Sequence, residues 1–500
     1  MGRIWAGARR KRGFRHDGCA SRLARAAAVG CAFALAACAV GPDFIRPASL
    51  VEADWTTLRS RAGRPGLSLG AEAFWASFHD QTLTRLLKKA DAHSPTLLGA
   101  AETVTQARRQ IRIDVANLLP TVDLSGSSEY GQPTLASSLK GGNLGATTDQ
   151  LLGQTSWEID FWGSLRRALA SDKNALLSSE AALQASRVSI EASVASAYVN
   201  LRMTERRIAV ARDNLAKQAE NKRIAEAKWR EGLDSELDFR QAESQYEQTK
   251  AQLPGLQQSL EQYRYSVSEL VGETPDWFAR TERADAGLPS TPNILPIGAP
   301  HDLLRRRPDV LQAEFNAAAQ SERIGVAEAA LYPTFSLTGA FGYATTGKLV
   351  DLFQWNNREL AYGAAFTLPI FDRDKLVSQV EIQDSLFRQQ VLAYQNQVLY
   401  AQQDVENGLA SIVGQTGTVR ELQRAYDAAA RASQLSLAQY RAGQVDYTTV
   451  SSAEQIRATT ADSLVQAQGA VLQGYIGTFR AIGGGWEPRA RAAEAGGDET

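Results

Sequence analysis

Residues 155–167 read Thr-Ser-Trp-Glu-Ile-Asp-Phe-Trp-Gly-Ser-Leu-Arg-Arg and join two different hydrophobic periods. Trp157, Ile159 and Phe161 alternate with polar residues, which is typical of a strand with one apolar and one wet face. Directly after Gly163 the apolar residues take the spacing of a long helix. The stretch therefore predicts an amphipathic strand that runs directly into a helical rod.

The rod is predicted to be a coiled-coil helix. Apolar residues recur every seven positions, first at Leu169, Leu176, Leu183 and Ile190 and then, four positions offset, at Val194, Leu201, Ile208 and Leu215. Such a repeat is the a/d seam of a coiled coil, and the breakers that several short helices would need are missing. Because Gly232 is the first turn signal, a helix over 165–231 would be about 100 Å long, followed by a return helix over 235–271.

The second half of the chain repeats this plan. Residues 364–371 alternate again, with Phe366, Leu368 and Ile370 on one face, and a second seven-residue spacing follows. Equivalent turn and break residues lie 211 to 213 positions apart, namely Pro95 and Pro308, Pro120 and Pro333, and Gly232 and Gly443. The sequence therefore predicts an internal duplication.

The duplication sets the domain organisation. We predict a first repeat over 74–271, a Pro-rich linker over 272–300 and a second repeat over 301–482. Each repeat begins with a helix and a first strand, which starts after Pro120 in one half and covers 333–343 in the other. A loop over 131–150 or 345–362 leads to the strand–rod junction.

The N-terminus carries a targeting segment. Residues 1–37 contain eight Lys or Arg, one acid and a small apolar run over 26–37, as a signal peptide does. The run ends in Leu-Ala-Ala before Cys38 and resembles a bacterial lipobox, which predicts cleavage there and a covalent acyl and diacylglyceryl lipid on Cys38. An ordinary signal peptide with an incidental cysteine is the alternative. Residues 38–73 would form a lipid-anchored strap, and 483–500 a disordered tail.

Composition argues against several function classes. The net charge is −1, and removal of the signal would leave a mature chain near −8, which disfavours nucleic acid as a partner. Cys38 is the only mature cysteine, the histidines are widely spaced, and we find no nucleophile motif or phosphate loop. We therefore expect no enzyme activity, no metal and no other cofactor. No apolar run of 18 residues follows the first 40, so no transmembrane helix is expected.

Four amphipathic strands per chain would leave open sheet edges, which a membrane does not tolerate. The strands must then close with further copies of the chain. Alternation of apolar and wet residues is typical of an outer-membrane barrel with a wet lumen. The lipid-facing residues would be Trp157, Ile159, Phe161, Phe366, Leu368 and Ile370, with Glu158 and Asp160 in the lumen.

Together these features identify a family resemblance. The chain resembles the TolC-like outer-membrane efflux proteins, in particular the lipoprotein branch that serves RND-type pumps. The residues that carry the resemblance are Cys38–Phe44, Phe74–Asp80, Ser156–Gly163, Ala286–Pro289, Asp302–Val310 and Ala330–Pro333.

The resemblance implies a fold and a function. The fold is a mixed α/β channel in which a homotrimer forms a 12-stranded outer-membrane β-barrel continuous with a long α-helical periplasmic barrel. The function is passive exit of drugs or other small solutes from a Gram-negative cell, delivered by an inner-membrane RND-type transporter and a periplasmic adaptor (membrane fusion) protein. A duct for type I protein secretion and a periplasmic coiled-coil scaffold without a pore are the alternatives.

The resemblance also implies a periplasmic gate where the rods turn back, at Gly232 and Gly443. Family members tie these turns with a tyrosine before one glycine and an aspartate after the other, and Tyr440 and Asp238 match those positions. Val445 replaces a basic residue of the family pattern, and Thr449 and Ser452 replace an acidic ring. The nearest acid is Asp446, which with the adjacent Tyr447 completes the predicted gate.

Overall fold

The computed structural model describes residues 39–48, 71–131, 146–282, 287–292, 306–346 and 348–484. The predicted signal peptide, the lipid site at Cys38, most of the strap and the tail beyond 484 lie outside these residues. Within the described residues, no helix is both long enough and apolar enough to cross a bilayer.

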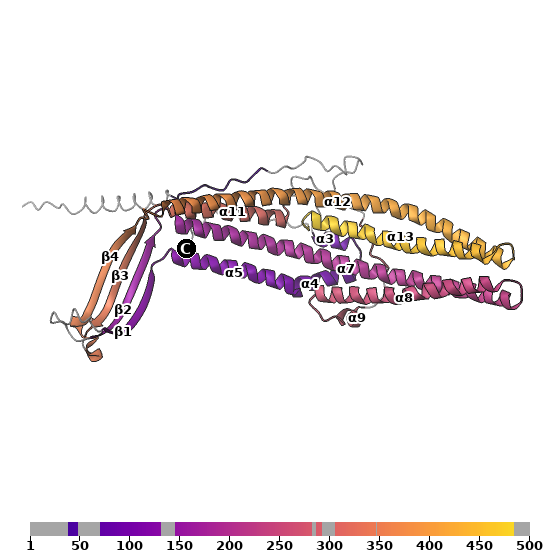
Figure 1. Ribbon diagram of the computed structural model, residues 1–500, viewed down its shortest axis with the longest axis horizontal. Helices are drawn as coiled ribbons and strands as arrows, with labels where there is room; N and C mark the ends of the chain where they lie inside the picture. The colour runs from indigo at the N-terminus through magenta and orange to yellow at the C-terminus, as the bar shows by residue number, and fades with distance from the viewer. Residues whose placement is uncertain are drawn as a thin grey trace, which may run out of the picture. The chain divides into compact units, whose positions relative to one another are not determined.

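Figure 1 shows long helices and one sheet. The helices are α3 (Ala71–Ala76), α4 (Gln81–His93), α5 (Pro95–Asn117), α7 (Ser164–Arg230), α8 (Glu236–Leu270), α9 (Trp277–Thr281), α11 (Pro308–Ala329), α12 (Arg373–Arg441) and α13 (Tyr447–Ala481). The strands are β1 (Thr121–Gly131), β2 (Ala146–Ile159), β3 (Thr334–Thr345) and β4 (Arg358–Thr367), with short 3-10 turns η1 (Leu349–Asp351) and η2 (Trp355–Asn357) before β4.

The chain divides into two compact units. Of the described residues, those within 1–45, 109–173 and 318–388 form the sheet unit, and those within 46–108, 174–317 and 389–500 form the helical unit. The long rods are present as predicted, since α7 has 67 residues and α12 has 69. In the helical unit, Val398, Val405 and Ile412 from the seven-residue spacing are buried, as are Val194 and Leu201 of the first rod.

The sheet is an antiparallel meander in the order β1-β2-β3-β4. Trp157 pairs with Leu337, Ile159 pairs with Phe335, and Phe335 pairs with Phe366. Because paired residues of antiparallel strands share a face, Trp157, Ile159 and Phe366 lie on one apolar face. The opposite face carries Glu158 and small or polar residues, so the predicted alternation is present.

Several predicted strand ends differ from the structure. β2 ends at Ile159, and Phe161 lies beyond it, with its ring 5.9 Å from that of Phe335. β4 ends at Thr367, because Pro369 cannot donate to a ladder and also restricts Leu368. Leu368 and Ile370 therefore lie outside the strand. β4 begins at Arg358, inside the predicted loop.

Asp160 also differs from its predicted place in the lumen. Its carboxylate accepts hydrogen bonds from the backbone amides of Leu165 and Arg166, both at 3.0 Å. These amides belong to the first turn of α7, whose N–H groups have no partner inside the helix. Asp160 therefore caps the rod, and Gly163 supplies the left-handed φ of 82° between strand and helix.

The helical unit has its core where α3, α7 and α13 meet. The ring of Phe74 stacks on that of Phe479 at 4.4 Å, and Trp75 packs beside it. Phe278 of α9 is buried in the same core. The first helix of the described residues thus begins at Ala71, within the predicted strap. The predicted linker contributes a core aromatic residue and is not only a connection.

Candidate functional site

Both helical hairpins turn at a glycine in the left-handed region. The φ angles are 72° at Gly232 and 70° at Gly443. The amide of Leu233 donates to the carbonyl of Lys228 at 2.8 Å, and the amide of Gln444 makes the equivalent bond in the other turn at 2.9 Å. This is the Schellman motif, which glycine adopts without strain. The structure therefore turns both rods back where the sequence predicts it.

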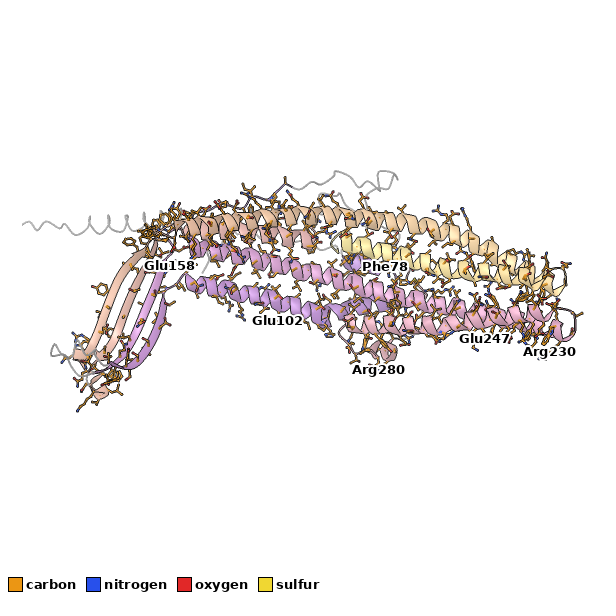
Figure 2. All side chains as sticks on the ribbon, in the orientation of Figure 1. Phe78, Glu102, Glu158, Arg230, Glu247 and Arg280 are labelled. Carbon is orange, nitrogen blue, oxygen red and sulfur yellow. The ribbon has the colours of Figure 1, made fainter. Side chains whose placement is uncertain are left out.

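A cluster of four residues joins the two turns, and we call Lys228, Asp234, Tyr440 and Tyr447 the tip cluster. The Tyr440 hydroxyl donates to Asp234 Oδ2 at 2.7 Å. Lys228 Nζ donates to the Tyr440 carbonyl at 2.8 Å and lies 3.9 Å from the centre of its ring. The Tyr447 ring meets that of Tyr440 edge-on at 5.6 Å. Figure 2 marks the turn by Arg230, the last residue of α7.

Burial keeps both tyrosines protonated. It raises the pKa of the Tyr447 hydroxyl to about 12. The pKa of Tyr440 is also raised, by burial first and then by the hydrogen bond to Asp234 and the charge on its carboxylate. Tyr440 therefore remains a hydrogen-bond donor throughout the physiological pH range.

The partner of Tyr440 differs from the prediction. Asp238 lies in the first turn of α8, where its amide donates to Ser235 Oγ at 3.2 Å and its carboxylate accepts from the same hydroxyl at 3.0 Å. This reciprocal capping holds Asp238 at the helix N-terminus. Asp234 precedes the cap, so its carboxylate is the one that reaches Tyr440 within this chain.

Asp446 and Tyr447 have different surroundings although they are adjacent. Asp446 is the N-cap residue of α13, yet its side chain makes no capping bond and is exposed. Tyr447 is 2% exposed and packs with Ala225, Ala242 and Val450. The carboxylate of Asp446 is thus free to act at the surface of the tip, whereas Tyr447 packs the cluster from within.

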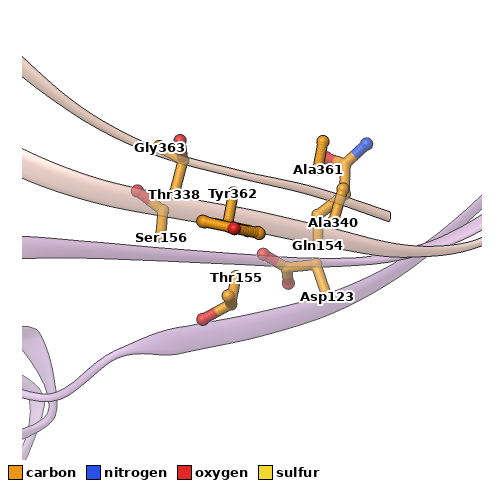
Figure 3. A pocket seen from close by; sticks show the side chains of 10 residues that line it. Asp123, Gln154, Thr155, Ser156, Thr338, Ala340, Ala361, Tyr362 and Gly363 are labelled. Carbon is orange, nitrogen blue, oxygen red and sulfur yellow. The ribbon is translucent and has the colours of Figure 1, made fainter. Parts of the chain in front are cut away.

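The wet face of the sheet forms a shallow hollow of about 440 Å³. Figure 3 shows Asp123, Gln154, Ser156 and Thr338 among the residues that line it. Tyr362 also lines the hollow, although by register it belongs to the apolar face. By register, the strand carboxylates on this face are those of Asp123, Glu129, Glu158 and Glu359. No Lys or Arg of the four described strands shares that face.

A sheet with one apolar and one wet face, whose strands continue into coiled-coil hairpins, defines a class of outer-membrane channel subunit. The family model described as outer membrane efflux protein matches residues 86–273 and 299–484. The chain belongs to this family, whose members are channel proteins of the Gram-negative outer membrane.

Individual relatives match over nearly their whole length. Nodulation protein T of Rhizobium leguminosarum bv. trifolii is 26% identical, over 92% of this chain and 97% of the relative. The pyoverdine export outer membrane protein OpmQ of Pseudomonas aeruginosa is 28% identical, over 91% and 95%. Among solved structures, the outer-membrane channel OprN has a TM-score of 0.83 at 28% identity, covering 90% of this chain and 100% of that one.

Proposed function

We propose that this chain is the outer-membrane exit channel of a tripartite efflux pump. Its role would be passive exit of small solutes that an inner-membrane RND-type transporter and a periplasmic adaptor deliver. The observation that carries the proposal is the sheet, in which every strand alternates an apolar face with a wet one. That pattern places lipid on one side and water on the other.

The sheet edges support a trimer. Among the described strands, β1 and β4 each have one neighbour, so each presents an edge that no described strand pairs. An unpaired backbone group in hydrocarbon costs several kcal/mol, which pairing between β1 of one copy and β4 of the next removes. Two copies would give a barrel of about 8 strands, and side chains fill the interior of a barrel of that size. Three copies therefore make the smallest closed barrel with a water-filled lumen.

The tip cluster is the proposed gate. Tyr440, Asp234 and Lys228 connect the two hairpins of one chain by hydrogen bonds and by a cation over an aromatic ring. The exposed carboxylate of Asp446 lies in the second turn and would add charge at the narrow end. Opening the channel would then require the two hairpins to separate at this cluster.

Cys38 is the proposed lipid site, because the preceding residues form a lipobox. Several acyl chains, at roughly 0.8 kcal/mol per buried methylene, would hold the N-terminus firmly on a leaflet. Mass spectrometry of the N-terminal peptide measures this directly.

Planar-bilayer recording of the purified protein tests the channel proposal. We expect discrete conductance steps and a native mass of three copies, with protein-free detergent as the blank. A coiled-coil scaffold without a pore would give neither. A protein that stays monomeric and silent in the bilayer, although correctly folded by circular dichroism, would refute the proposal.

A further inference from the structure

The connection between β3 and β4 exposes several large apolar side chains, and we call residues 348–358 the apolar loop. Four side chains of its two short turns, η1 and η2, are each 65% to 81% exposed in the single chain, namely Leu349, Val350, Phe353 and Trp355. Clusters of exposed apolar side chains usually mark a surface that binds a membrane or a partner. The apolar loop is therefore a candidate interaction surface.

The apolar loop is held by its own hydrogen bonds. The amide of Asp351 donates to the carbonyl of Lys348 at 2.9 Å, and the amide of Gln354 donates to that of Asp351 at 3.0 Å. The Asn357 side chain also donates to the Asp351 carbonyl, at 2.7 Å. Leu352 is 6% exposed, so the loop buries one leucine while its neighbours point outward. The exposed apolar side chains thus belong to a folded structure.

The loop packs on the apolar side of the sheet. The ring of Phe353 meets that of Tyr343 edge-on at 5.7 Å. Tyr343 pairs with Arg358, and the next pair on the same face is Phe341 with Leu360. Because paired residues of antiparallel strands share a face, all four lie on the apolar face. The apolar surface of the loop therefore continues the surface that the strands would present to lipid.

The length of β4 places Arg358 near the edge of the apolar band. Eight positions separate Arg358 from Phe366 along the strand. They span about 27 Å at about 3.4 Å per residue. A strand tilt of about 35–45° shortens this to about 20 Å across the bilayer, and the apolar band of such a barrel is about 25 Å tall. A band that begins at Phe366 therefore ends within about two residues of Arg358, at the level of the lipid headgroups.

Arg358 forms no ion pair with the described residues. Its Nη1 donates to the Trp355 carbonyl at 2.8 Å, and the central carbon of its guanidinium lies 4.6 Å from the centre of the Trp355 ring. Lys348 is exposed and has no acidic partner in the described part of the chain either. The acid of the loop, Asp351, already accepts from Gln354 Nε2 at 2.6 Å. The loop therefore offers two cations beside an apolar surface.

The internal duplication does not explain this composition. In the first repeat the connection between β1 and β2 covers residues 132–145, and its sequence contains no aromatic residue. The apolar loop carries both Phe353 and Trp355. The aromatic residues thus belong to one of the two connections only.

We propose that the apolar loop binds a phosphate-bearing lipid of the outer leaflet, with the phosphate on Arg358 and Lys348 and the acyl chains along Val350 and Phe353. A guanidinium can donate two parallel hydrogen bonds to one phosphate, and the Trp355 ring holds it in place. The loop lies at the strand ends away from α7 and α12, which is the outer end because the rods extend into the periplasm. The proposal rests on the proposed channel function, since it needs the strands to lie in a bilayer.

Native mass spectrometry of the full-length protein in detergent tests the headgroup specificity. The probes are phosphatidic acid, which carries a phosphate monoester, and phosphatidylcholine. The wild type should bind phosphatidic acid about tenfold or more tightly than phosphatidylcholine, because a cation near an anionic lipid favours binding. Arg358→Ala combined with Lys348→Ala should abolish most of this preference and leave phosphatidylcholine binding unchanged. Inorganic phosphate should not displace the lipid.

Fluorescence quenching tests whether the loop contacts acyl chains. The protein is placed in vesicles of phosphatidylcholine with bromine along the acyl chains. The emission of Trp355, obtained as the difference between the wild type and Trp355→Phe, should be strongly quenched. Trp355 is 67% exposed in the single chain, so this change leaves the fold intact.

Two variants in the helical unit serve as controls. Arg424→Ala removes an exposed arginine from α12 and should not change the lipid preference. The emission of Trp277 in α9, obtained in the same way from Trp277→Phe, should not be quenched.

Three results would overturn the lipid site. An unquenched Trp355 would show that a neighbouring copy of the chain covers the loop. An equal preference for phosphatidic acid in the wild type and the double variant would exclude Arg358 and Lys348. Complete displacement by inorganic phosphate would leave an anion site without a lipid. None of these results changes the trimer mass or the conductance of the wild type, so failure of the lipid site is distinguishable from failure of the channel.

Discussion

Tyr440 contributes to the gate in two separable ways. Its hydroxyl binds Asp234, and its ring contacts Lys228 and Tyr447. Tyr440→Phe removes the hydrogen bond and keeps the ring, while Asp234 remains 3.4 Å from Lys228 Nζ. The lost bond is worth about 0.5–1.5 kcal/mol. We expect the ratio of closed to open channels to fall by roughly fivefold per kcal/mol lost. Bilayer recordings would show this as a higher open probability.

Tyr400→Phe is the control for this change, because Tyr400 is an exposed tyrosine of the same helix α12. Equal gating in both variants would exclude the hydroxyl of Tyr440 from the closed state.

At single positions, the sequence predicted which residue types form the gate better than it predicted their hydrogen-bond partners. Tyr440 and the two turn glycines follow from a family pattern and from turn chemistry. The choice between Asp234 and Asp238 does not, because it depends on which carboxylate the α8 cap already occupies. Lys228 has only a weak local signal, a cation in the last turn of α7.

At the scale of elements, Arg307 joins three helices of the helical unit. It precedes α11, donates to the carbonyl of Ala481 at the end of α13, and contacts the carbonyl of Ala401 in α12 at 3.4 Å. It also pairs with Asp309 at 2.6 Å. Removing one partner of a buried ion pair typically costs about 3–5 kcal/mol.

We therefore expect Arg307→Ala to lower the free energy of unfolding by about that amount, measured by denaturant titration in detergent. Arg388→Ala breaks an exposed ion pair within α12 and should cost about 0.5 kcal/mol or less. If the two variants were equally stable, Arg307 would not hold these helices together.

The lipid-facing assignment of the strands can be tested at two adjacent residues of β3. Phe341 lies on the apolar face and is 55% exposed in the single chain, whereas Ala340 lies on the wet face. Near the bilayer midplane, Phe341→Arg should lower the free energy of unfolding by about 2–4 kcal/mol. The amount of folded protein in the outer-membrane fraction should then fall. Ala340→Arg should assemble normally, and the opposite ranking would reverse the two faces.

Long periodic elements could be predicted to within a residue or two, because a seven-residue spacing from Leu169 to Leu215 marks the helix, and Gly163 and Gly232 mark its two ends. The rod predicted over 165–231 is α7, Ser164–Arg230. Short elements depended on context that local periodicity does not contain. Pro369 ends β4 early, Asp160 turns from the lumen to cap α7, and α9 forms inside the linker because Phe278 packs into the core.

At the scale of the whole molecule, the proposed trimer would concentrate negative charge in one lumen. The described strands of one copy place four carboxylates on the wet face and no Lys or Arg, namely Asp123, Glu129, Glu158 and Glu359. Three copies would therefore bring twelve carboxylates into the lumen. Low-dielectric walls focus the field of such groups and favour cations over anions. We therefore expect the open channel to be cation-selective.

A reversal potential measured across a salt gradient tests this selectivity. Asp123→Asn combined with Glu359→Gln should move the reversal potential toward zero, and Glu236→Gln, an exposed acid in the first turn of α8, should not. The Debye length falls from about 10 Å at 0.1 M salt to about 3 Å at 1 M, so the selectivity of the unmodified channel should weaken over that range. An anion-selective channel, or a reversal potential that is the same in the double variant and the wild type, would show that this face does not line the conducting path.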